Sequence, residues 1–299
     1  TQIRDKGVFK DAGTPYANCL IYSLNGSTHG YVDVSHALEV SCNYFFYEVG
    51  RRMGINKLDE YAKKFGLGEK TGIELDEEVA GHMASPEYKK EVVASATDRE
   101  WFGGDTLQAA IGQSYSLFTP IQLANYAATI ANGGARYLIK SVRSSVDGGV
   151  VKEFNPEVVE KVDMDDEVIN AVKQGMKRVV DEGSASEIFA NYGIAVGGKT
   201  GTTNDNYDAW FVGFTPQYAA SVWIGNDVNI ELSQGSSAAA SLWSKVMRQI
   251  APKGETTRFP SQPSDVYMSG GEHYVKGTSR TGPAVSGLDE EPEVLYDET

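Results

Sequence analysis

Residues 196–225 read VGGKTGTTNDNYDAWFVGFTPQYAASVWIG. They contain three short runs of apolar and β-branched residues, at 196–203, 209–214 and 218–225, with short turns between them. Runs of this kind in close succession predict three strands of an antiparallel sheet. The stretch 236–250 then carries apolar residues at helical spacing, so we expect a helix that packs on one face of the sheet.

Helical patterns also precede this sheet. Asp33 can cap a short helix, and apolar spacing predicts a second helix over 45–53 and a third over 58–65. Gly54 and Gly66 follow the second and third patterns, where glycine commonly ends a helix. This part of the chain is therefore expected to be mainly helical.

The middle of the chain alternates between loops and regular patterns. Residues 66–106 are rich in Gly, Asp and Pro and predict loops. Residues 119–122 read Thr-Pro-Ile-Gln and predict a helix start, because the threonine can cap, the proline suits the first helical position and the glutamine completes a capping box. A hairpin is expected over 137–154, and a long helix over 168–180.

Composition narrows the class of protein. Of the 299 residues, 41% are hydrophobic and 23% are charged, which is typical of a globular chain with a sizeable core. The formal net charge is -14 and no Lys/Arg cluster interrupts it, so nucleic-acid binding is not expected. No apolar run reaches the length of a membrane span, and no basic-then-apolar leader opens the chain.

The two ends of the chain differ from its middle. Residues 1–9 read as the interior of a domain, so we expect the sequence to be a piece of a longer protein. From residue 252 the chain is rich in Pro, Gly and Ser, and 289–299 holds six acidic residues. These features predict a poorly ordered acidic tail over 252–299, after one domain over 1–251.

The sharpest chemical signal is Lys199-Thr200-Gly201-Thr202-Thr203, on the first predicted strand. The lysine supplies positive charge, the threonines supply hydroxyls, and backbone N–H groups along an open strand edge can bind a developing oxyanion. Gly197 and Gly198, just before it, would let a substrate backbone lie close to the strand. A Lys-Thr-Gly triplet alone is weak evidence, because it fits a surface turn as well.

A second candidate is Ser41-Cys42-Asn43, at the junction of two predicted helices. The serine can relay a proton, and the asparagine can hold a substrate carbonyl or amide. Taken alone, the motif is better explained by a serine and an asparagine that cap helices at their boundary.

Cysteine and histidine give weaker signals. Cys19 and Cys42 are too few for a disulfide scaffold and the wrong number for a zinc site, so they read as buried thiols, with one disulfide as the alternative. The histidines show no metal-ligand spacing, so no metal site is expected. Cys42 with His29 or His36 as its base is a further, minor candidate for a nucleophilic pair. The four histidines are at positions 29, 36, 82 and 273.

Taken together, the two motifs resemble those of serine acyl-transferases of the penicillin-binding and β-lactamase type. That family carries Ser-x-x-Lys, then Ser-x-Asn, then Lys-Thr-Gly, and the last two occur here in that order. Other stretches also resemble segments of this family, and several of them are typical of the class B, monofunctional penicillin-binding proteins. These stretches lie at 65–68, 71–73, 104–113, 119–124, 131–134 and 209–216. The resemblance as a whole covers about residues 30–250.

The chain departs from the family in one respect, because it contains no Ser-x-x-Lys, the motif that holds the nucleophile. In family members this motif precedes Ser-x-Asn, so we expect it shortly before Thr1 in a longer protein, together with the first strands of the family's sheet. Loss of the nucleophile lowers the turnover of a serine acyl-transferase on the order of a million-fold. The chain as printed is therefore not expected to form an acyl-enzyme.

The resemblance implies an α/β (α+β) fold, with an antiparallel sheet flanked by helices and a mainly helical subdomain. It implies D,D-transpeptidation of peptidoglycan stem peptides, in which a serine attacks the D-Ala–D-Ala amide and a second peptide's amine resolves the acyl-enzyme. β-Lactam antibiotics would bind as mimics of that substrate, and no cofactor is implied. The parent protein would be anchored at the extracytoplasmic face of the bacterial membrane, with other cell-wall synthesis or division proteins as partners.

The same resemblance assigns roles to individual residues. Ser41 would join the proton relay, Asn43 would orient the substrate amide, and Lys199 would sustain a positive potential and hydrogen-bond the relay. Thr200 and Thr202 would contact the substrate carboxylate, and the backbone N–H of Thr202 would complete the oxyanion hole. The other residues expected to bind substrate are their neighbours on the strand, Gly201 and Thr203.

Two alternatives stay open at this point. A D,D-carboxypeptidase or β-lactamase-like hydrolase would use the same motifs but resolve the acyl-enzyme with water, and the class B-like stretch at 104–134 argues against it. A non-catalytic module that binds peptides or proteins would need no serine nucleophile. The sequence upstream of Thr1 separates this second alternative from the enzymes.

Overall fold

The computed structural model describes residues 1–10, 17–251, 259, 266–269 and 272–275. The chain divides into two compact units, Thr1–Thr257 and Arg258–Thr299. In the second unit, strands β12 (Val266–Ser269) and β13 (Glu272–Val275) pair as an antiparallel hairpin. Apart from this hairpin and residue 259, the predicted acidic tail lies outside the described residues.

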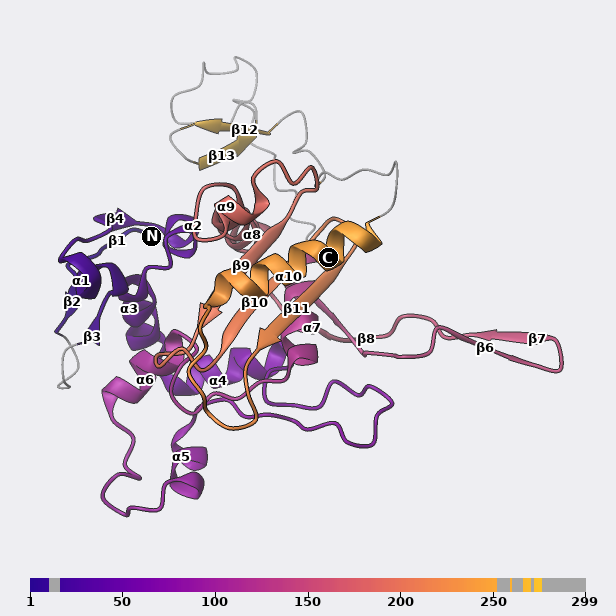
Figure 1. Cartoon of the computed structure of the whole chain (residues 1–299), viewed down its shortest axis with the longest axis horizontal. Coiled ribbons are helices and arrows are strands. Elements are labelled where there is room, and N and C mark those ends of the chain that lie inside the picture. The colour runs from indigo at the N-terminus through magenta and orange to yellow at the C-terminus, as the bar shows by residue number, and fades with distance from the viewer. Residues whose placement is uncertain (11–16, 252–258, 260–265, 270–271, 276–299) are drawn as a thin grey trace, which may run out of the picture. The chain divides into compact units, whose positions relative to one another are not determined.

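The centre of the first unit is an antiparallel sheet with the strand order β11-β10-β9 (Figure 1). Its strands are β9 (Gly197–Thr202), β10 (Ala209–Phe214) and β11 (Ala219–Ile224). The sequence prediction of this sheet is confirmed, because the strands depart from the expected ranges by at most one residue at either end. Within the described part of the chain, β9 pairs with a strand on one side only, so its other edge is open.

Two glycines of β9 are required by the aromatic rings of β10. A Cβ added to Gly198 would lie 2.4 Å from Cζ of Phe211, and one added to Gly197 would lie 2.7 Å from Cζ of Phe214. Both rings are buried. The glycines therefore serve the packing of the sheet, which is a different reason from the close substrate approach that the sequence suggested.

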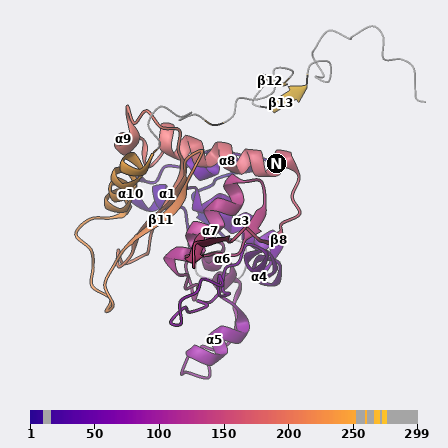
Figure 2. The ribbon, with the colours of Figure 1, turned by 90° about the vertical axis from the view of Figure 1, so that its right-hand side faces the viewer.

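Helices cover both faces of the sheet. On one face, Phe211 packs in a buried cluster with Trp243 and Met247 of α10 (Ser236–Ile250), as the sequence predicts. On the other face lies α7 (Pro120–Ala131), where the hydroxyl of Ser221 donates a hydrogen bond to the carbonyl of Pro120. Figure 2 shows α10 and α7 on opposite sides of β11. The sheet is thus enclosed between layers, which fixes the position of its edge strand.

The start of α7 confirms the predicted capping box. The hydroxyl of Thr119 accepts a hydrogen bond from the backbone N–H of Gln122 at 3.3 Å. The side-chain oxygen of Gln122 accepts one from the backbone N–H of Thr119 at 2.8 Å. These two bonds satisfy donors that the first turn of a helix otherwise leaves unpaired.

The helical part of the first unit begins with α2 (Val34–Glu39), α3 (Asn43–Met53) and α4 (Ile55–Lys64), which confirm the three predicted helices. Helix α3 packs closely on α6 (Gly103–Ala110), because a Cβ at Gly50 would lie 2.4 Å from Cβ of Ala110. Among the described residues, no helix is both long and apolar enough to cross a membrane.

The expectation of loops over 66–106 is wrong at α5 (Pro86–Val92) and at the first turn of α6, which begins at Gly103. Helix α5 shows why no repeat is visible in the sequence. Its start has a local signal, since the hydroxyl of Ser85 accepts a hydrogen bond from the N–H of Tyr88 at 3.1 Å and proline occupies the first helical position. The helix has only 7 residues, so it is too short to show a helical repeat among the glycines and aspartates around it.

Helix α8 (Asp166–Asp181) joins the helical part to the sheet by packing against both α2 and β9. Its Gly175 allows a close approach, because a Cβ there would lie 2.7 Å from Cδ1 of Leu38. Ser35 of α2 donates a hydrogen bond to the carbonyl of Ala171 at 2.7 Å. These contacts hold α2 against a helix that also packs on the edge strand.

Short elements complete the first unit. The hairpin of β6 (Ser144–Asp147) and β7 (Val150–Glu153) confirms the predicted turn and projects from the rest of the unit (Figure 1). The others are β1 (Ile3–Arg4), β2 (Val8–Phe9), β3 (Ala17–Asn18), α1 (Leu20–Asn25), β4 (Tyr31–Val32), β5 (Ala135–Tyr137), β8 (Val158–Lys161) and α9 (Ser186–Phe189).

The glycine–ring packing of the sheet makes a testable prediction. Gly198→Ala should lower the free energy of unfolding by about 1–3 kcal/mol, because the added methyl group overlaps a buried ring. Gly201→Ala is the matched control on the same strand, since its Cβ would meet its nearest atom, Cβ of Trp210, at 3.3 Å. Urea denaturation measures both changes, and an equal loss in the two variants would contradict the packing argument.

Candidate active site

The turn that carries Ser41 ends helix α2 with a Schellman motif. The backbone N–H of Cys42 donates to the carbonyl of Ala37 at 2.9 Å, and that of Ser41 donates to the carbonyl of Leu38 at 3.3 Å. In this motif one residue adopts a left-handed conformation, usually a glycine. Here that residue is Ser41, with φ of 52°.

A serine in this position costs stability that a glycine would not, so its side chain has a use that the turn itself does not require. The turn places Ser41 at the junction between α2 and α3, with Asn43 as the first residue of α3. Both residues are half-buried, whereas Cys42 between them is fully buried. The turn therefore leaves Ser41 and Asn43 partly accessible and buries Cys42 between them.

The strand register directs Lys199 toward this turn. Lys199 lies opposite Val212, and Val212 lies opposite Ser221, whose hydroxyl contacts α7. Residues opposite one another in a sheet share a face, so Lys199 points to the face that the helical part covers. Its Nζ donates a hydrogen bond to Oγ of Ser41 at 2.6 Å, across 158 residues of sequence.

Burial changes the chemistry of Lys199. Only part of its side chain is exposed, its Nζ is surrounded by protein atoms, and this desolvation lowers its pKa to about 8. Its hydrogen-bond partners are neutral, since Nζ also donates to the backbone carbonyl of Thr200 at 2.9 Å. The amine is therefore close to the point at which it can either hold or release a proton near neutral pH.

The threonines of the strand have separate partners. The hydroxyls of Thr200 and Ser184 form a hydrogen bond at 2.7 Å, and the side chain of Thr202 is exposed. The hydroxyl of Thr203 accepts from the N–H of Asp208 at 2.9 Å, and this closes the turn after β9. Ser184 and Asp208 could not be predicted from the sequence, because neither belongs to a motif and their contacts form only in the fold.

The carboxylate of Asp208 holds the end of the open strand in place. Its Oδ2 accepts a hydrogen bond from the hydroxyl of Thr203 at 3.2 Å, and its Oδ1 accepts one from Nε1 of Trp223 at 2.8 Å. Trp223 lies on β11, at the far side of the sheet. Asp208 therefore ties the last residues of the Lys-Thr-Gly strand to the rest of the sheet.

Of the two bases considered for Cys42, His29 lies beside it, together with Asp5 and Cys19, and His36 does not belong to this group. Cys19 and Cys42 are both free and buried, as the interpretation of buried thiols predicts. The expectation of no metal site rests only on the number and spacing of cysteines and histidines along the chain. It does not apply to these four side chains, whose potential ligand atoms all lie within 4.8 Å of one another.

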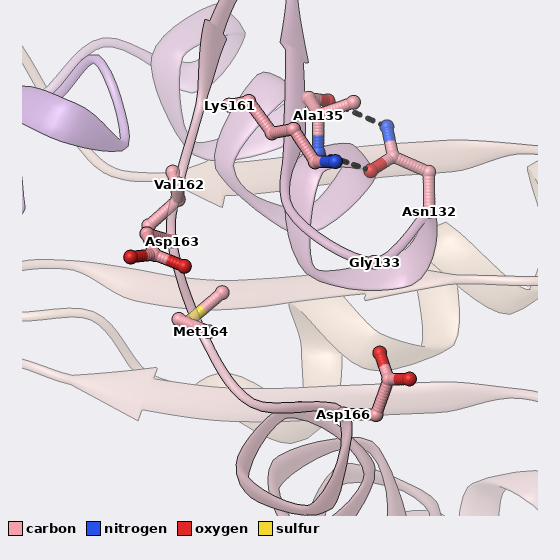
Figure 3. Close-up of a pocket in the computed structure, with 8 residues that line it drawn as sticks. All are labelled: Asn132, Gly133, Ala135, Lys161, Val162, Asp163, Met164 and Asp166. Carbon is pink, nitrogen blue, oxygen red and sulfur yellow. Dashed lines mark hydrogen bonds between the residues drawn. The ribbon is translucent and has the colours of Figure 1, made fainter. Parts of the chain in front are cut away.

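A hollow of about 580 Å³ lies away from both motifs, at the end of α7 and the start of α8 (Figure 3). The side chain of Asn132 there bonds to the backbone of Ala135, at 2.7 and 2.9 Å, and accepts a hydrogen bond from the backbone N–H of Gly134 at 3.2 Å. None of the motif residues lines this hollow, so we do not assign it to the site. Its lining residues are Asn132, Gly133, Ala135, Lys161, Val162, Asp163, Met164 and Asp166.

Comparison with known proteins places this chain in a family. The family model described as penicillin binding protein transpeptidase domain matches residues 2–248. The chain belongs to this transpeptidase family. Peptidoglycan D,D-transpeptidase MrdA of Haemophilus influenzae is 30% identical over 260 residues, which cover 78% of this chain and 39% of that protein. The resemblance to class B, monofunctional members is therefore confirmed.

Solved structures agree on the fold of the transpeptidase domain. Pseudomonas aeruginosa PBP2, in complex with WCK 5153, matches with a TM-score of 0.68 and 26% identity, over 86% of this chain and 55% of that chain. The complex between PBP2 and MreC from Helicobacter pylori matches with a TM-score of 0.65 and 24% identity, over 84% and 45%. The predicted fold class is confirmed, and the chain spans less than two thirds of each of these relatives.

The left-handed conformation of Ser41 predicts an unusual order of variants. Ser41→Gly should unfold with a free energy about 1 kcal/mol higher than Ser41→Ala, because both lose the hydroxyl and only glycine relieves the turn. At Ser241, a half-buried residue in the middle of α10, the order should reverse by about 0.5–1 kcal/mol. Urea denaturation measures both pairs, and the same order at the two sites would refute the assignment.

The lowered pKa of Lys199 predicts a pH dependence of stability. The unfolded lysine, at its ordinary pKa of 10.5, binds its proton more tightly than the folded one at about 8. The cost of burial is therefore fully present below pH 8 and disappears as the pH rises to 10.5. Relative to Lys199→Met, the wild-type free energy of unfolding should rise by up to about 3 kcal/mol across this window.

Chemical denaturation in reducing buffer, repeated from pH 7 to pH 10.5, measures this difference. Lys245→Met removes an exposed lysine of α10 and controls for the loss of one positive charge. A constant difference between wild type and Lys199→Met across the window would show that Nζ is solvated, against the argument from burial.

Proposed function

We propose that this chain forms the part of a peptidoglycan D,D-transpeptidase that carries its Ser-x-Asn and Lys-Thr-Gly motifs. The observation that supports the proposal most directly is the 2.6 Å hydrogen bond from Lys199 to Ser41, which joins the two motifs across 158 residues. The printed chain holds no Ser-x-x-Lys. The nucleophilic serine is accordingly supplied by residues outside this sequence, and the chain alone forms no acyl-enzyme.

Each residue then has a defined task. Lys199 donates to Ser41, so the hydroxyl of Ser41 is free to pass a proton toward the leaving amine of the substrate. With a pKa near 8, Lys199 is mostly protonated at neutral pH and also attracts the terminal carboxylate of the stem peptide. Asn43, on the same turn, holds the substrate amide through its side chain.

The open edge of β9 provides the surface for the substrate backbone. An extended peptide can add to an unpaired strand edge through main-chain hydrogen bonds. The backbone N–H of Thr202 stabilises the developing oxyanion, and the hydroxyls of Thr200 and Thr202 bind the substrate carboxylate. Gly201 and Thr203 complete this edge. β-Lactam antibiotics occupy the same positions as mimics of the D-Ala–D-Ala amide.

The proposal extends to the setting of the protein. The relatives include a D,D-transpeptidase named MrdA and a PBP2 that forms a complex with MreC. By analogy, the complete protein acts at the extracytoplasmic face of the bacterial membrane, alongside other proteins of cell-wall synthesis. This analogy favours a role in cell shape, and it assigns no partner-binding surface to the chain.

Labelling with a fluorescent penicillin tests this function. The product of the complete gene should label on the serine of a Ser-x-x-Lys motif, which peptide mapping locates, and the chain as printed should not label. Lys199→Met in the complete product should slow acylation by about 100-fold to 1000-fold, because one preorganised charge at the reacting centre is lost. Lys245→Met is the matched control and should label at the wild-type rate.

Two outcomes would contradict the proposal. A folded complete product that does not label would favour a non-catalytic binding module. Labelling that is as fast in Lys199→Met as in wild type would show that the contact with Ser41 has no part in the reaction. Transfer of the acyl group to an added D-amino acid, rather than to water, then separates a transpeptidase from a carboxypeptidase.

A further inference from the structure

The turn between α8 and α9 reaches both motifs of the candidate active site. A Cβ added to Gly183 would lie 2.4 Å from the carbonyl oxygen of Glu39, the last residue of α2. The next residue, Ser184, lies beside the strand instead, because its hydroxyl and that of Thr200 form a hydrogen bond at 2.7 Å. The function proposed above gives no task to Ser184.

The backbone around Ser184 is held by its neighbours. The backbone N–H of Ala185 donates a hydrogen bond to the carbonyl of Val179 at 3.0 Å, and Ala185 is buried. The hydroxyl of Ser186 donates to the carbonyl of Gly183 at 2.8 Å. These bonds close the turn without the side chain of Ser184, which is exposed. The hydroxyl of Ser184 is therefore not required by the turn itself.

The hydroxyl of Thr200 has a second neighbour, because Nζ of Lys199 lies 3.5 Å from its Oγ1. A protonated lysine can only donate, whereas a hydroxyl offers one proton and two lone pairs. When Ser184 donates in the 2.7 Å bond, the lysine and the serine face both lone pairs of Thr200. Thr200 then keeps its own O–H for a third partner. In the reverse arrangement, Thr200 gives that proton to Ser184.

We propose that Ser184 is a positioning residue that aims the hydroxyl of Thr200 at the carboxylate of the substrate. This inference rests on the function proposed above, in which Thr200 binds that carboxylate. An ionised carboxylate only accepts hydrogen bonds, so its arrival selects the arrangement in which Ser184 donates to Thr200 and Thr200 donates onward. Hydroxyls linked in this way polarise one another, which strengthens the last bond of the chain.

The effect of Ser184 falls on the binding of the substrate and not on the transfer of its acyl group. The carboxylate carries the same charge before and after the serine nucleophile attacks, so a contact with it stabilises the ground state and the transition state alike. Loss of such a contact weakens the initial complex and leaves the first-order rate of acylation unchanged. This division between binding and chemistry separates Ser184 from the relay of Ser41 and Lys199.

Two forms of one penicillin, the free acid and its methyl ester, test this inference on the complete gene product. Ser184→Ala should raise the Kd of the initial complex with the free acid about tenfold, because the bond to the charged carboxylate loses its support. Acylation by the ester should change by less than about twofold, since the ester carries no charge. The preference for acid over ester therefore falls. Competition against a fluorescent penicillin, over a range of concentrations, measures these constants.

Two further variants separate this role from a general loosening of the turn. Ser184→Thr keeps a hydroxyl at the same position and should retain the preference for the acid within about twofold. Ser186→Ala removes the neighbouring hydroxyl, which bonds to the backbone of Gly183 and not to the strand, and should show the wild-type preference. Circular dichroism checks that all three variants fold.

The inference is overturned if Ser184→Ala discriminates acid from ester as the wild type does, or if Ser186→Ala or Ser184→Thr loses the preference to the same extent. It is equally overturned if Ser184→Ala slows the first-order step at an unchanged Kd, since Ser184 would then act in the chemical step. Each of these results leaves the proposed function standing, because the wild type still forms an acyl-enzyme. If the folded wild-type product reacts with neither form, the proposed function and this inference fall together.

Discussion

The candidate active site depends on holding a lysine in dehydrated surroundings beside a hydroxyl from another part of the chain. Burial that lowers the pKa of Lys199 to about 8 disfavours its charged form, so the fold must stabilise this arrangement from both sides. On the sheet side, Phe211 and Trp243 pack behind the strands that carry the lysine. On the helical side, α8 packs on α2 and on β9, so the serine and the lysine cannot separate without opening this layer.

The glycines of β9 show how closely packing and chemistry are joined on this strand. Gly197 and Gly198 leave room for two rings of β10, which anchors the strand from within the sheet. The other edge of β9 has no strand beside it in the described part of the chain. A strand held firmly on one edge and open on the other can accept an extended peptide without first losing its own hydrogen bonds. Rigidity and access therefore come from the two edges of one strand.

Features encoded by neighbouring residues could be predicted from the sequence, whereas features that depend on distant segments could not. The capping box at Thr119 and the alternating strands around Lys199 have local signals, and both are confirmed. The two motifs could be identified in the sequence, but their contact could not be predicted, because Ser41 and Lys199 are 158 residues apart. Two other contacts, of Ser184 with Thr200 and of Asp5 with His29, leave no periodic pattern in the sequence. They therefore could not be predicted from residue spacing.

The Ser41–Asn43 turn explains why these distant contacts had to form together. A left-handed serine is unfavourable by itself. The turn therefore persists only if the contacts around it stabilise the fold by more free energy than the strain at Ser41 costs. Lys199 fixes Ser41 from the front through its hydrogen bond, and Cys42 is held from behind by full burial next to Asp5 and Cys19. Because the turn buries Cys42 and leaves Ser41 partly accessible, one short segment can take part in a proton relay and in a structural cluster without the two interfering. Because Cys42 and Ser41 are adjacent, a substitution in the buried cluster can displace Ser41 through a single peptide bond. A substitution at the exposed edge of β9 must instead act on Ser41 through Lys199.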